Sequence, residues 1–166
     1  MKKAAALLLC AVLLTGAVSC GPGGPSSSPE SQQTTVTPTT VNLIDADITA
    51  YLTAAEASEV LGVTMTADAP LEYGTQLRMS DERGAVTLDL ALREGTEEDL
   101  LAIAAGWEDA PNLGRTARWD PEGGELLIDC GDGHLLSIVL TLPDTQAKNA
   151  LVYSRELADK ILSRLL

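Results

Sequence analysis

Hydrophobic and polar residues alternate along positions 75–94, as they do in strands with one buried face. The apolar residues at every second position of the second half are Val86, Leu88, Leu90 and Leu92, and they follow a turn at 81–84. A period of two residues is typical of a half-buried strand. Positions 75–94 are therefore predicted to form a hairpin with one face on the core.

Three more strands are predicted near 115–119, 124–130 and 134–141, separated by turns rich in glycine. The last two are apolar on both faces, which indicates a sheet covered on both sides or a central position in it. A two-residue turn at Asp132-Gly133 places Cys130 opposite Leu135. This register assigns Leu126, Ile128, Cys130, Leu135 and Val139 to one face, and Leu127, Leu136, Ile138 and Leu140 to the other.

Three helices are predicted from capping signals and from a period of 3.6 residues. The capping box at 53–56 begins a short helix, and Gly62 ends it. Thr96 and the acidic residues after it begin a second helix, which Gly106 ends. An amphipathic pattern over 144–166 predicts a long final helix. The order α-ββ-α-βββ-α indicates an α+β fold, with an antiparallel sheet of about five strands packed by three helices.

The chain begins with the pattern of an export signal. Two lysines precede an apolar run at 4–14, which is shorter than the roughly 20 residues of a transmembrane helix. Cys20 follows the small residues 15–19 and matches a bacterial lipobox, in which the thiol takes a diacylglycerol. We therefore predict signal removal at 1–19 and a lipid anchor at Cys20, on the extracytoplasmic face of a bacterial membrane. Cleavage without lipidation, giving a secreted protein, is the alternative.

Positions 20–41 and 42–166 differ sharply in composition. The first segment is rich in Gly, Pro, Ser and Thr and is predicted to be a disordered tether behind the lipidated cysteine, while the second is predicted to be a single α+β domain. The chain has 24 acidic and 11 basic residues, a net charge of −13 that becomes −15 without the two signal lysines. Such a charge repels nucleic acid, so no nucleic-acid partner is expected, and the acyl chains must hold the protein at the membrane.

One stretch of the domain resembles a known layout. It runs through Asn112-Leu113-Gly114-Arg115-Thr116-Ala117-Arg118-Trp119, then Leu126-Leu127-Ile128, then the helix Leu157-Ala158-Asp159-Lys160-Ile161-Leu162-Ser163-Arg164-Leu165. This is similar to the C-terminal half of small bacterial lipoproteins of uncharacterised function, some of which look like the PsbP-like α/β/α sandwich. The resemblance implies a surface-anchored binding or accessory domain without catalysis.

Catalytic or metal chemistry has few candidates in this chain. A metal-independent hydrolase would centre on His134 with Cys130 or Ser137, but Cys130 is expected in an inert apolar row and His134 at an exposed turn. A lone histidine cannot hold a transition metal, so neither a metal nor a cofactor is expected. The acidic positions Asp120, Glu122, Glu125, Asp129 and Asp132 fit no calcium loop, and solvated turns explain them better.

Trp107 and Trp119 are the candidates for ligand or partner contact, because both flank the irregular connection 106–121. Core positions explain each of them as well, Trp119 more readily because it alternates with Ala117 on a strand. We expect a binding or accessory domain whose partner is an envelope protein or a small ligand. A hydrolase and a structural envelope spacer are the alternatives.

Overall fold

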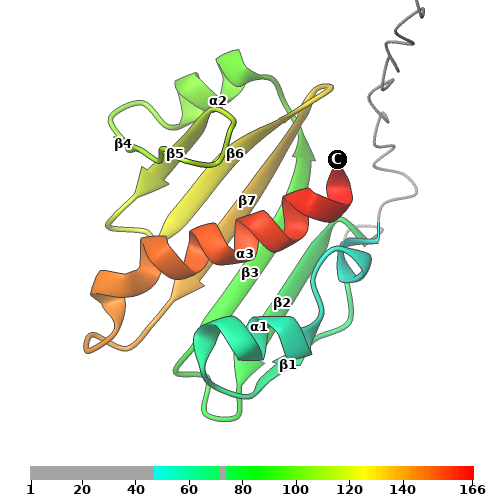
Figure 1. The fold of residues 1–166 in the computed structure, drawn as a ribbon, viewed down its shortest axis with the longest axis vertical. Coiled ribbons are helices and arrows are strands. Elements are labelled where there is room, and N and C mark those ends of the chain that lie inside the picture. The colour runs from blue at the N-terminus through cyan, green and yellow to red at the C-terminus, as the bar shows by residue number, and fades with distance from the viewer. Residues whose placement is uncertain (1–46, 72–73) are drawn as a thin grey trace, which may run out of the picture. The chain divides into compact units, whose positions relative to one another are not determined.

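Seven antiparallel strands form one sheet in the computed structural model, which describes residues 47–71 and 74–166 (Figure 1). The order across the sheet is β1-β2-β3-β7-β6-β5-β4. The strands are β1 (Met65–Ala67), β2 (Gln76–Asp81), β3 (Thr87–Glu94), β4 (Glu108–Asp109), β5 (Ala117–Asp120), β6 (Glu125–Gly131) and β7 (His134–Thr141). The predicted α+β class is confirmed, but the count of about five strands is wrong, because β1 and β4 are too short to produce an alternating pattern.

Three α-helices accompany the sheet: α1 (Ala54–Leu61), α2 (Glu97–Ile103) and α3 (Ala150–Leu165). The predicted capping box at Thr53 begins α1, and Gly62 ends this helix with a φ of +69°, as the sequence predicts. The predicted start of α2 at Thr96 is also confirmed, and there Thr96 forms a capping box with Asp99. Two 3-10 turns, η2 (Ile48–Ala50) and η4 (Ala147–Asn149), precede α1 and α3. The order is thus α-βββ-α-ββββ-α.

Two helix boundaries differ from their predictions. The final helix begins at Ala150 rather than at 144, because Gln146 N and Ala147 N both donate to Pro143 O in a turn that leads into η4. The second helix ends at Ile103, ahead of Gly106. In both cases the amphipathic pattern continues through a turn that is not α-helical.

The helices cover the two faces of the sheet unequally. α1 and α3 lie across one face (Figure 1) and bury the main core with alternate residues of the central strands. α2 packs on the other face, where Leu100 and Ala104 meet Leu127 of β6 and Leu135 of β7. The prediction that the last two strands are buried on both faces is confirmed, whereas β2 and β3 bury only every second side chain.

The predicted side-chain faces of the last hairpin are wrong in part. Asp132 and Gly133 form the expected two-residue turn with positive φ, and Gly131 pairs with His134. A β-bulge between Asp129 and Gly131 then shifts the register, so Cys130 has no directly opposing residue. One-residue slippage exchanges the two faces of a strand. As a result Leu136, Ile138 and Leu140 share the main core with Leu126, Ile128 and Cys130, while Leu135 faces α2.

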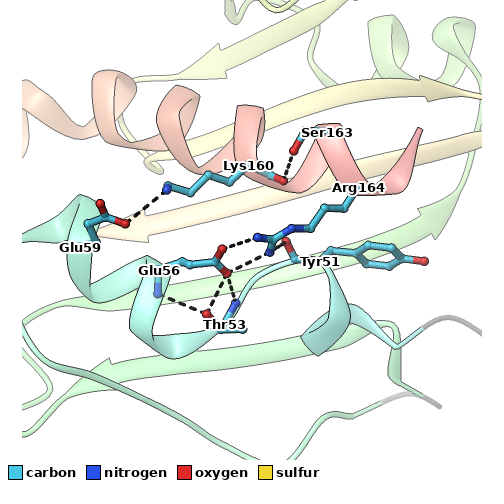
Figure 2. A network of polar contacts seen from close by, with 7 residues as sticks. All are labelled: Tyr51, Thr53, Glu56, Glu59, Lys160, Ser163 and Arg164. Atoms are coloured by element: carbon cyan, nitrogen blue, oxygen red, sulfur yellow. Dashed lines mark hydrogen bonds and ion pairs between the residues drawn. The ribbon is translucent and has the colours of Figure 1, made fainter.

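α1 and α3 are tied together at the surface by ion pairs (Figure 2). Arg164 donates from both terminal guanidinium nitrogens to the Glu56 carboxylate, and its Nη1 also donates to Tyr51 O at 3.1 Å. Lys160 Nζ lies 3.4 Å from Glu59 Oε2. These contacts link the first helix to the last, across about 100 residues of chain.

Candidate functional site

The sheet face opposite α1 and α3 is open over β2, β3 and the second half of β7, because α2 packs over β5, β6 and the start of β7 at Leu135. The strand register places two rows of side chains across this open face. The first row is Arg78, Asp89, Val139 and Glu125, and the second is Gln76, Ala91, Ser137 and Leu127. The first row is charged at both ends, whereas the second runs from Gln76 over the small residues Ala91 and Ser137 to Leu127, which is buried under α2.

A hollow of about 570 Å³ lies on this open face. Ala91 and Ser137 stand side by side at its floor on β3 and β7, and Asp68, Ala69 and Leu71 line it from the segment after β1. Pockets that hold small ligands span about 300–1,000 Å³. The hollow therefore has the size of a ligand site and is the candidate functional site of the described chain.

Ion pairs and hydrogen bonds fix the polar groups of this face. Arg78 donates from Nε to Asp89 Oδ1 at 2.6 Å and from Nη2 to Asp89 Oδ2 at 3.0 Å, and this bonding raises the pKa of Arg78. Ser137 Oγ donates to Glu125 Oε1 at 2.7 Å, and Arg93 Nη2 lies 3.6 Å from the same oxygen. The charged groups of Arg78 and Asp89 and the hydroxyl of Ser137 are thus already held in fixed positions without a ligand.

A second hollow lies beside the turn 121–124 and the start of α3, with a volume of about 190 Å³. Trp119 is among its lining residues, yet only 6% of the Trp119 side chain and backbone is exposed, and the ring packs in the main core. The volume is below that of typical ligand pockets. This hollow is the weaker candidate.

The two tryptophans predicted for contact lie apart in the fold. Trp119 is a core residue of β5. Trp107 follows α2, where its N donates to Ala104 O at 3.0 Å, and it is half-buried against the cluster around Leu100. Neither ring lines the larger hollow, so the hollow involves residues that the sequence did not single out, apart from Ser137.

The structure does not assemble the residues of the hydrolase alternative. Cys130 is buried in the main core, where burial raises the pKa of its thiol to about 11. Ser137 lies on the opposite face and donates to Glu125, away from His134. His134 stands three residues earlier on β7, about 10 Å along the strand, and its Nδ1 is buried without a partner among the described residues. Neither Cys130 nor Ser137 therefore has His134 as its base.

The acidic positions of the hairpins also serve local structure. Asp120 Oδ1 accepts from Glu122 N at 3.0 Å, and Asp129 Oδ1 accepts from Gly131 N at 3.0 Å. Within 47–71 and 74–166, no three His, Cys, Asp or Glu side chains are grouped so that they could hold a metal ion. Turn formation accounts for the carboxylates of Asp120 and Asp129.

The export signal, Cys20 and the tether 20–41 lie outside the described residues. In the part of the chain that the structure describes, no helix has the length and apolarity needed to cross a membrane. Comparisons with protein-family models, with curated proteins and with solved structures find no match for this chain. Fold and site define the class: an α+β domain whose antiparallel sheet is covered by helices on one face and half-open on the other.

Proposed function

We propose that this protein is a lipid-anchored binding or accessory domain on the extracytoplasmic face of a bacterial membrane, and that it binds a small ligand on its open sheet face. The hollow of about 570 Å³ carries this proposal. Its floor combines the small side chain of Ala91 with the hydroxyl of Ser137, which is only 6% exposed and already oriented by Glu125. Preformed concave sites with a few fixed polar groups are typical of ligand binding.

The arrangement favours binding over the two alternatives. The hydrolase alternative needs His134 as the base beside Ser137, whereas the Ser137 hydroxyl donates to Glu125, whose carboxylate is also paired with Arg93. A structural spacer needs no preformed hollow. The open half of the sheet has both the space and the fixed polar groups that a binding site requires.

The binding role is tested by thermal unfolding of the full chain in the presence of a library of small metabolites. A true ligand should raise the melting temperature of the wild-type protein and have no effect on Ala91→Leu, whose larger side chain fills the floor of the hollow. Ala102→Leu adds the same volume at an exposed position of α2 and should keep the response. A library without any stabilising compound, or equal responses in both variants, would contradict the proposal.

The anchor is tested separately by mass spectrometry of the protein purified from bacterial membranes. Signal removal before Cys20 and addition of a diacylglycerol should appear as a single modified N-terminal peptide, and Cys20→Ser should release the protein from the membrane fraction. An unmodified Cys20 in a freely secreted product would overturn the anchor and leave the binding proposal standing.

A further inference from the structure

Two carboxylates and one guanidinium line the hollow, so its lining carries an excess negative charge. Arg78 uses Nε and Nη2 on Asp89, at 2.6 and 3.0 Å. Asp68 lies within electrostatic range of the same guanidinium, because its charge also contributes to the raised pKa of Arg78. The Asp68 carboxylate is exposed and accepts no hydrogen bond from a residue that the structure describes. Of the two lining carboxylates, Asp89 is thus held by Arg78, and Asp68 is the one that no described residue engages through a hydrogen bond.

The remaining lining of the hollow is largely apolar. Ala69, Ala91 and Val139 present small aliphatic groups, and Leu71 at the rim is 63% exposed, more than any other large apolar side chain among the described residues. Burying such surface under a ligand is favourable, because it removes apolar area from water. A ligand that fits this lining has an aliphatic body as well as a polar end.

The charge of the lining indicates whether the polar end of the ligand is a cation or an anion. The neighbouring cation, Arg93, lies 3.6 Å from Glu125, and the whole chain has a net charge of −13. An anionic ligand or a second acidic copy of this chain would meet repulsion on this face. Building on the proposed binding function, we infer that the hollow binds a small organic cation, with an ammonium group at Asp68 and an aliphatic body over Ala91 and Val139.

The inference is tested with three probes that share a six-carbon body and differ in charge: hexylamine, hexanoate and hexanol. Binding to the full chain is measured by isothermal titration at low ionic strength, where charges are little screened. Hexylamine should bind at least about fivefold more tightly than hexanoate, and the preference should shrink in about 1 M salt. Equal binding, or tighter binding of hexanoate, would overturn the inference.

Matched variants separate the site from the general attraction of an acidic protein for amines. Asp68→Asn should remove most of the preference for hexylamine over hexanol, while Asp159→Asn on α3, which changes the net charge equally, should retain it. Ala91→Leu should weaken all three probes. If the probes respond to Ala91→Leu but not to Asp68→Asn, the hollow is a binding site and the cation inference fails. If neither substitution changes the affinity for hexylamine, the amine binds elsewhere on the protein and the cation inference fails. That result would not contradict the proposed binding of another small ligand in the hollow.

Discussion

Leu100 holds α2 on the sheet, and its truncation tests how far this helix depends on one side chain. The Leu100 side chain is fully buried against Leu127 and Leu135 in the smaller core cluster. With seven residues, α2 is too short to be stable without such packing. Leu→Ala substitutions at fully buried positions cost about 2.7–5.0 kcal/mol, and we expect Leu100→Ala to lower the free energy of unfolding by about 3 kcal/mol.

The matched control is Leu101→Ala, the same chemical change on the next residue of α2. Leu101 is 42% exposed, so its truncation should cost about 1 kcal/mol or less. Urea unfolding followed by circular dichroism gives both free energies, and hydrogen exchange reports whether the amides of α2 lose protection in Leu100→Ala. Equal costs for the two substitutions would refute the reasoning, because burial at Leu100 would then not be what holds α2.

Three further predictions concern other contacts. Hydrogen bonds from Arg164 are the largest cause of the lowered pKa of Glu56, so ionised Glu56 stabilises the fold above its unfolded pKa of about 4.3, and this contribution is lost as the pH falls below that value. Glu56→Gln should therefore be destabilising at neutral pH, and urea unfolding should show the difference shrinking in acid; a constant difference contradicts this. Cys130, with its pKa of about 11, should react with iodoacetamide only as fast as the protein unfolds, and labelling at the rate of a free thiol would argue against burial. Gly124→Ala should lower the melting temperature more than Gly133→Ala, since both have positive φ but only a Cβ at Gly124 would lie 2.6 Å from a backbone oxygen of β7; equal losses would contradict that contact.

Sequence patterns that span only a few neighbouring residues correctly predicted the starts of α1 and α2 and the buried face of β3. The capping box at Thr53 and the helix start at Thr96 are formed as expected, because each threonine side chain accepts from a backbone amide only three residues away. The alternation along 86–92 likewise identifies one buried face of β3. The edge strand β4 has only two residues, and its pairing with β5 leaves no periodic trace in the sequence.

The error in the last hairpin has a specific physical origin. Counting outward from the turn at Asp132-Gly133 assumes that every residue of one strand faces one residue of the other. The bulge at Cys130 breaks that count, so each residue of β6 before it faces a partner one position earlier along β7, nearer the turn, than expected. Sequence periodicity cannot locate such a bulge here, because both faces of the two strands are apolar.

The hollow was not predicted because its residues come from segments that are distant in the chain. Asp68, Arg78, Asp89 and Ser137 meet only when β7 pairs with β3 and β3 with β2. A usable signal nevertheless exists in the sequence: Ala91 breaks the polar side of β3 with a small residue, and Ser137 breaks an apolar strand with a hydroxyl. Neighbouring strands with small residues at paired positions indicate where a sheet face has room for a ligand.

The helices cover one half of the second sheet face and leave the other half open, and the residue pattern of the strands already indicates this difference. β6 and β7 are apolar on both faces and need α2 as well as α3, while β2 and β3 alternate and need helices on one face only. Polar side chains on the second face of β2 and β3 make its exposure to solvent stable without a covering helix. The same alternation that leaves this half open also supplies Arg78 and Asp89 to its rim. The hollow therefore lies on a face that is separate from the main core under α1 and α3.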